Sequence, residues 1–316
     1  MSTPTIAERI DTVADGIHRF DTRYIRPRHT AAHVLVSGDD VAIIDCAVTA
    51  TVEPLLEALG TLGVEPAQVG HLVITHAHMD HAGGAGVLME RLPNARLCAH
   101  PSAAKHLVDP TKLEAGVRAV FGDDFFEREY APVKPVAAER VVATDDGDTI
   151  AFGERALQAV HTPGHAWHHQ GLWEPDTRTL FSGDAFGVGY PELTGDDGPL
   201  FVPETPPPQF VPEEMHASID RIVDLDPAIV APTHFEIVTD AAAVADGLHR
   251  LVDDTVARCR EAASQEALAE ELLAAYAAEL ERRGRGGDVA AMRPLYEFDA
   301  RLSAQGLWLW REKKAR

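Results

Sequence analysis

The sequence predicts an α/β protein with two β-sheets covered by helices and a helical appendage at its C-terminal end. Apolar runs short enough for strands alternate with segments of helical spacing through residues 1–240. Several of these runs end in turn residues followed by histidine or aspartate, which is typical of strand ends that carry site residues. After residue 240, Ala, Glu, Leu and Arg predominate at helical spacing.

The first β-rich block opens with short runs at 32–36 and 41–45, joined by the hairpin signal Ser37-Gly38-Asp39-Asp40. Residues 49–62 have helical spacing, and Gly63 ends that helix. A strand, a helix, a strand and an interrupted helical segment are then expected at 72–74, 82–92, 95–99 and 101–130. The second block follows the turn at 146–148, with strands expected at 156–160, 170–173 and 179–181.

Residues 190–212 contain seven prolines and are expected to lack regular structure. A long irregular segment within a compact domain is often a lid or binding loop. It begins six residues after Asp184, and its aromatic residues Tyr190, Phe201 and Phe210 are the expected substrate contacts.

The C-terminal region is expected to form helices at 241–260, 265–282 and 292–303. The predicted division is therefore a catalytic domain at 1–240 and a helical extension at 241–316. The apolar end at 307–310 alternates awkwardly for a helix, and it either docks on the core or contributes to a homodimer.

The densest chemical signal is the stretch THAHMDHAGG at residues 75–84, directly after an apolar run. His76 and His78 project to the same side of an extended backbone, whereas Asp80 and His81 belong to a tightening turn and face elsewhere. One short segment can therefore serve two neighbouring metal ions. Imidazole with carboxylate suits zinc or iron, whereas calcium and magnesium favour oxygen ligands.

Three further candidate ligands each follow an apolar stretch. His165 ends the sequence HTPGH, Asp184 ends LFSGD, and His234 ends IVAPTH. With these residues in this order, the chain resembles the metallo-β-lactamase superfamily over about residues 17–234. The resemblance implies a four-layer αββα sandwich whose ligands come from loops along one edge.

The resemblance also implies a role for each ligand. It assigns His76, His78 and His165 to a first metal ion, Asp80, His81 and His234 to a second, and Asp184 to a bridge between them. Asp45 resembles the carboxylate that hydrogen-bonds a metal-bound histidine in the family. His169 occupies a position where glyoxalase II-like chains also have histidine, and it is a candidate for supporting the ligands.

The expected activity is that of a dinuclear metal-dependent hydrolase, most similar to the glyoxalase II group, acting on a small thioester or ester. Two cations sharing a hydroxide lower the pKa of water toward roughly 7, and Asp80 can orient the hydroxide and carry a proton. The cofactors are expected to be two divalent ions, with zinc favoured and iron or manganese open. The alternatives are a lactonase of the acyl-homoserine lactone type, assisted by Tyr190, and a mononuclear-iron persulfide dioxygenase.

The composition of the chain argues against nucleic acids and membranes as binding partners. The formal charge of −22 argues against a nucleic-acid-cleaving relative, because binding a polyanion normally needs clusters of Lys and Arg. No apolar run approaches the roughly 20 residues of a membrane span, and the first residues lack the pattern of a secretory signal. The expectation is a cytoplasmic protein without nucleic-acid or membrane partners. The three cysteines are widely separated, so no disulfide framework is expected.

Overall fold

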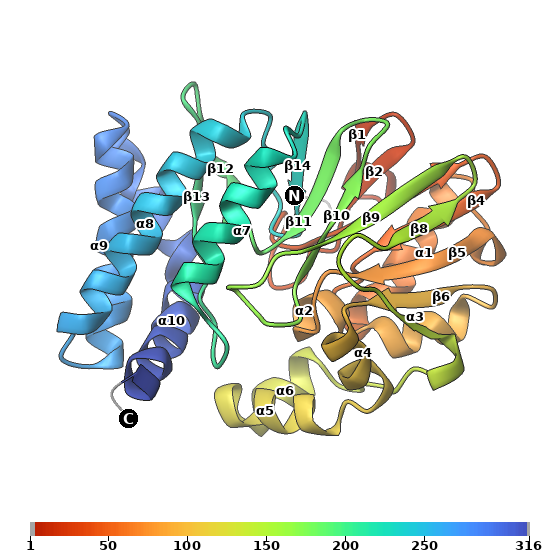
Figure 1. Ribbon diagram of the computed structural model, residues 1–316, viewed down its shortest axis with the longest axis horizontal. Helices are drawn as coiled ribbons and strands as arrows, with labels where there is room; N and C mark the ends of the chain where they lie inside the picture. Colours follow the sequence, from red (N-terminus) through yellow and green to blue (C-terminus); the bar gives the residue numbers. More distant parts are fainter. Residues whose placement is uncertain (1–3, 315–316) are drawn as a thin grey trace. The chain divides into compact units, whose positions relative to one another are not determined.

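The computed structural model describes residues 4–314 (Figure 1). The chain divides into two compact units, the first made of Met1–His161 and Gln170–Phe181, the second of Thr162–His169 and Ser182–Arg316. These units follow the packing of the chain, and the functional boundary expected after residue 240 stays a prediction. No helix within residues 4–314 is long and apolar enough to cross a membrane.

A seven-stranded sheet in the order β1-β2-β3-β4-β5-β6-β7 forms the centre of the first unit. Pairing is antiparallel from β1 to β4 and parallel from β4 to β7. The predicted hairpin at 37–40 is confirmed, because Ser37 pairs with Asp40 and Gly38 takes a positive φ of 62°. The strands are β1 Ile10–Ala14, β2 Ile17–Asp21, β3 Ala31–Ser37, β4 Asp40–Ile44, β5 Val69–Ile74, β6 Arg96–Ala99 and β7 Val141–Ala143.

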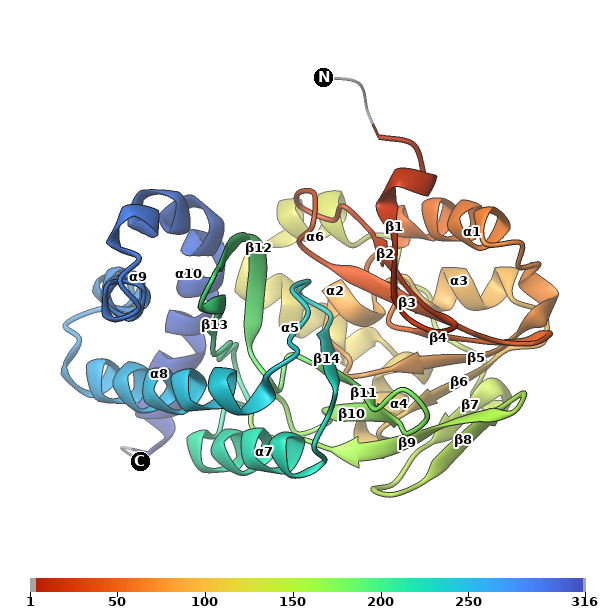
Figure 2. The same ribbon diagram turned by 90° about the horizontal axis from the view of Figure 1, so that it is seen from above.

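Helices α1 and α3 cover one face of this sheet (Figure 2). Leu55 and Leu59, four apart on α1, are fully buried and pack in one core with strand residues that include Ile43 and Leu72. The spacing places one apolar stripe of the helix on the sheet. The helices of this unit are α1 Val52–Thr61, α2 Met79–Ala82, α3 Ala85–Arg91, α4 Pro101–Val108, α5 Thr111–Phe121 and α6 Asp123–Glu129, with 3₁₀ turns at Ala7–Arg9, Thr49–Thr51, Pro66–Gln68 and Ala138–Arg140.

The other face of the sheet meets a second, antiparallel sheet in the order β11-β10-β9-β8. The Gln170 side chain donates a hydrogen bond of 3.0 Å to the Ile74 carbonyl, and the ring of His33 lies 5.0 Å from that of Phe181. Two sheets therefore face each other, with helices outside the first, as predicted. The strands are β8 Thr149–Phe152, β9 Arg155–His161, β10 Gln170–Glu174 and β11 Thr179–Gly183.

The second unit contains a two-stranded ribbon in the first part of the segment expected to be irregular, so the prediction is wrong for residues 190–202. Residues 203–211 lack regular structure, as expected. Strands β12 (Val188–Gly195) and β13 (Gly198–Val202) pair antiparallel. Pro191 lies where the pairing register of the ribbon shifts, between Gly189 and Thr194, and proline is accepted in strands at such irregularities. Proline is therefore tolerated here, although it disfavours central strands.

The remaining elements of the second unit are mostly helical: α7 Pro212–Asp224, β14 Ile229–Pro232, α8 Ala241–Glu261, α9 Gln265–Arg282, a 3₁₀ turn at Gly286–Asp288 and α10 Val289–Lys314. Two predicted helices are confirmed in α8 and α9, which begin after the capping residues Asp240 and Ser264. Helix α7 lies against α8 in both views (Figures 1 and 2).

Helix α10 is longer than the predicted helix at 292–303 and continues through the apolar end. Leu307 is fully buried, and its carbonyl accepts a bond from the Cys259 thiol on α8. Arg311 donates to the carbonyls of Cys259 and Ala262 at the end of α8. These contacts between helices stabilise a helical conformation that the local sequence pattern does not favour.

Candidate metal centre

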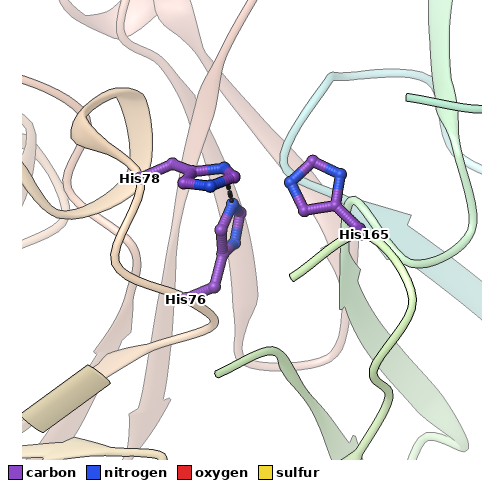
Figure 3. Close-up of side chains that lie close together, drawn as sticks. All are labelled: His76, His78 and His165. Carbon is purple, nitrogen blue, oxygen red and sulfur yellow. Dashed lines mark hydrogen bonds between the residues drawn. The ribbon is translucent and has the colours of Figure 1, made fainter. Parts of the chain in front are cut away.

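The first unit presents two histidines immediately after β5. His76 is fully buried, and its Nε2 lies 2.9 Å from Nδ1 of His78, the residue that precedes α2 (Figure 3). The two rings converge edge to face, with centroids 4.5 Å apart. The expectation that an extended backbone turns these side chains to one side is confirmed.

The next two candidate ligands lie on α2. His81 is fully buried, and its Nε2 is 3.6 Å from the Asp80 carboxylate, whose side chain is 25% exposed. Both residues lie in the first turn of this helix, and the centroid of the His81 ring is 4.0 Å from that of His76. His81 therefore does not face away from His76, contrary to the expectation from the sequence pattern.

Asp45 orients the ring of His81 through a hydrogen bond to its Nδ1. It follows β4 with a positive φ of 55°, and its carboxylate accepts hydrogen bonds from the Thr75 backbone and hydroxyl. The same carboxylate lies 2.9 Å from His81 Nδ1. Because a carboxylate accepts, Nδ1 carries the proton and Nε2 is the nitrogen available to a metal. The hydrogen bond expected of Asp45 is therefore present.

The second unit carries His165 in the loop after β9. Gly164 before it has a φ of 124°, and a Cβ there would lie 2.3 Å from the Met215 nitrogen, so a side chain does not fit. His165 Nδ1 lies 3.1 Å from the backbone carbonyl of Glu204 and donates to it. The ring is thereby oriented with Nε2 as the nitrogen that can bind a metal.

Asp184 lies between two imidazoles in the same unit. Its Oδ2 is 3.5 Å from His165 Nε2, and its Oδ1 is 3.8 Å from His234 Nε2. Both distances exceed those of ordinary N–H···O hydrogen bonds. A nearly buried carboxylate with one oxygen toward each ring has the arrangement of a bridging ligand.

His169 supports Asp184, as the sequence suggested. The backbone N–H of Asp184 donates to His169 Nε2 at 3.1 Å, and the Thr162 hydroxyl lies 2.8 Å from His169 Nδ1. His169 is fully buried, so it holds the backbone at the start of the Asp184 turn.

Sequence reasoning missed Glu204. One carboxylate oxygen of Glu204 lies within 4.8 Å of ligand atoms from His165 and Asp184, and the side chain is only 6% exposed. Its one sequence signal is an acidic residue inside an apolar, proline-rich stretch, which is typical of a loop. A buried acid beside two candidate ligands is either a further ligand or a partner for one.

The three expected substrate contacts lie in the interior. Tyr190 is fully buried, and its hydroxyl donates to the Asp299 carboxylate at 2.8 Å. Burial raises the pKa of the Tyr190 hydroxyl well above its ordinary value. Phe201 and Phe210 are also buried. The structure gives these side chains a packing role, and substrate contact stays a prediction for them.

Comparison with known proteins agrees with the fold and the motifs. The family model of the metallo-beta-lactamase superfamily matches residues 25–234. A hydroxyacylglutathione hydrolase of Aeromonas hydrophila is 29% identical over 55% of this chain and 49% of its own length. One from a Synechococcus strain is 28% identical over 59% and 55%. The metallo-beta-lactamase fold-containing protein ST1585 of Sulfurisphaera tokodaii is 25% identical over 54% and 62%.

The chain thus spans about half to two thirds of the length of these curated relatives. Two solved structures share its fold. The archaeal superfamily protein ST1585 from Sulfolobus tokodaii has a TM-score of 0.61 at 22% identity, covering 74% of this chain and 85% of its own. The metallo-beta-lactamase family protein TTHA1429 from Thermus thermophilus has a TM-score of 0.62 at 19% identity, covering 86% and 95%. The chain therefore belongs to the metallo-β-lactamase superfamily and has the mixed sheet and helix architecture predicted from its sequence.

Proposed function

We propose that the chain is a dinuclear metal-dependent hydrolase acting on a small thioester or ester. The observation that carries the proposal is the Asp184 carboxylate, which directs one oxygen at His165 and the other at His234. Two imidazoles that share one carboxylate suit two neighbouring cations better than one.

The donor set fits divalent transition metals. His76, His78 and His165 would hold one ion, Asp80, His81 and His234 the other, and Asp184 would bridge them. Rings at His81 and His165 have their Nδ1 atoms engaged by Asp45 and by the Glu204 carbonyl, so each presents Nε2. Imidazole and carboxylate donors favour zinc, and iron and manganese are also accepted.

The bound ions would supply a water that ionises near neutral pH and would polarise the carbonyl under attack. The chain's own residues have separate tasks. Asp184 is almost completely buried and keeps its position, because His169 accepts a hydrogen bond from its backbone. Asp80 has the more exposed carboxylate, so it is the group suited to take a proton and return it to the leaving group.

Similarity to two hydroxyacylglutathione hydrolases supports a thioester substrate. The basic cluster near residue 283 does not add support for glutathione itself. Arg282 and Arg283 bond to Glu279, and Arg285 bonds to Asp288, so carboxylates of the same unit already neutralise these cations. We therefore propose the thioester class and leave its acyl and thiol groups to experiment.

Lactone hydrolysis and persulfide oxidation are outcomes of the same test. Tyr190 is the residue expected to assist the oxyanion in a lactonase. Its hydroxyl instead donates a hydrogen bond to Asp299, so the specific reason for preferring lactone hydrolysis is removed. A small-molecule substrate is the proposed partner. A cytoplasmic location and a homodimer stay predictions.

The test is to purify the protein without added metal or chelator and to assay a glutathione thioester, an acyl-homoserine lactone and a glutathione persulfide. Two divalent ions per chain with thioester turnover support the proposal. A single iron with oxygen consumption and no hydrolysis would replace it with the dioxygenase. The variant His78→Ala should lose metal and turnover, whereas the control His18→Ala, on β2, should keep both.

A further inference from the structure

A pair of histidines joins α7 to α8 and belongs to neither of the ligand sets above. Nδ1 of His216 lies 2.6 Å from Nδ1 of His249. The ring planes differ by 11°, and the centroids are 4.9 Å apart. Since the centroid separation exceeds the nitrogen separation by about two ring radii, the rings are nearly coplanar and meet edge to edge, with the two Nδ1 atoms facing.

Each ring has a carboxylate at its other nitrogen. His216 Nε2 lies 3.1 Å from Asp253 on α8, and His249 Nε2 lies 3.1 Å from Asp220 on α7. Each aspartate follows a histidine by four residues on its own helix, so the arrangement is reciprocal across the helix pair. A carboxylate accepts hydrogen bonds, so both Nε2 atoms carry protons, and in the neutral form of each ring Nδ1 then presents a lone pair.

Two lone pairs that face each other at 2.6 Å repel unless a cation lies between them. We propose that His216 and His249 form a surface site for a transition-metal ion such as Zn²⁺, bound through both Nδ1 atoms. Imidazole is a preferred ligand of such ions, and metal-bound histidines usually donate their other N–H to a carboxylate. Both features are present here in duplicate.

The site is accessible and its charge is suitable. The side chains of His216 and His249 are 27% and 28% exposed, so water can complete the coordination of the ion. The carboxylates of Asp220 and Asp253 offset the charge of the cation. Zinc–nitrogen bonds are about 2.0–2.1 Å long, so the rings have to separate by less than about 1 Å on binding. Rotation about side-chain bonds at a partly exposed helix pair can supply that movement.

The proposal is tested by equilibrium dialysis of the metal-loaded protein against Zn²⁺, with metal per chain measured after dialysis. Wild type should take up one more zinc per chain than His249→Gln, whereas the control His18→Gln should match wild type. The double variant Asp220→Asn/Asp253→Asn keeps both rings and should bind this zinc about 10–100-fold more weakly. Hydrolysis at the wild-type rate in His249→Gln would show that this variant is folded.

A second measurement needs no variant. Nitrogen NMR of the imidazoles should show that one added equivalent of Zn²⁺ shifts the Nδ1 signals of His216 and His249 and leaves their Nε2 signals nearly unchanged. Equal zinc uptake by wild type and His249→Gln would overturn the proposal, as would Nδ1 signals that stay in place at saturating zinc. The short distance between the two Nδ1 atoms would then be explained by a proton that they share.

Discussion

Replacing Asp45 by asparagine isolates the effect of one hydrogen bond on metal affinity. Asparagine has the same shape and tolerates the positive φ of 55° at this position. Its carbonyl oxygen can still accept from the Thr75 backbone, which bonds to Asp45 Oδ1 in the wild type. Its amide nitrogen then occupies the place of Oδ2 and donates to His81 Nδ1. The proton of the His81 ring moves to Nε2, the nitrogen assigned to the metal.

The expected loss follows from that change of tautomer. Removing a hydrogen-bonding partner from behind a metal ligand costs about 10–100-fold in metal affinity, or roughly 1.4–2.7 kcal/mol. Asp45 is fully buried, so water cannot substitute for the lost carboxylate. We expect Asp45→Asn to lower the affinity for one of the two ions by this amount. The affinity for the other ion should not change, because its set of ligands does not include His81.

Competition with a chromophoric zinc chelator measures both affinities. The matched control is Asp21→Asn, which changes a buried carboxylate of the same unit that accepts from the Arg23 and Arg28 backbones. It should lower stability and leave zinc affinity unchanged. Wild-type zinc affinity in Asp45→Asn would refute the role given to Asp45 and the assignment of His81 Nε2 as a ligand.

Three further outcomes are expected. Tyr190→Phe should keep its metal but lose about 1–3 kcal/mol of stability in urea unfolding, because buried Asp299 loses a donor; unchanged stability would contradict that contact. Gly164→Ala should lower both stability and zinc affinity, since its Cβ has no room beside Met215, and a wild-type melting temperature would argue against this packing. Burial lowers the pKa of His33 to about 3, so the native chain keeps this ring neutral while the unfolded chain takes up a proton below about pH 6.5. Stability is therefore lost as pH falls from about 6.5 toward 3, by about 2 kcal/mol at pH 5, and His33→Leu should lose correspondingly less between pH 7 and 5; equal losses would count against a buried neutral His33.

The ligand motif was predictable because its chemistry is local. His76 and His78 are two residues apart after one apolar run, and Asp45 follows another. The pattern of apolar residues alone therefore predicted that these side chains lie at strand ends. The hydrogen bond from His81 to Asp45 joins residues 36 apart in sequence and was expected only from the family resemblance.

What the sequence did not predict depends on tertiary contacts. The β12–β13 ribbon accommodates Pro191 because the strand pairing is irregular there, and α10 extends to Lys314 because its apolar end packs on α8. The one local signal at Glu204, an acid in a proline-rich stretch, does not indicate a ligand, since only folding brings this carboxylate next to His165. The histidine pair on α7 and α8 is equally hard to find in the sequence, because His216 and His249 are 33 residues apart.

Metal content measured beside hydrolysis is the decisive test of a dinuclear hydrolase. Protein purified without added metal or chelator should contain two divalent ions per chain and hydrolyse a thioester at a rate that falls with chelation, and His78→Ala should lose both the ions and the turnover. Full turnover by metal-free protein, or one ion per chain with no hydrolysis of any ester or thioester, would contradict this proposal.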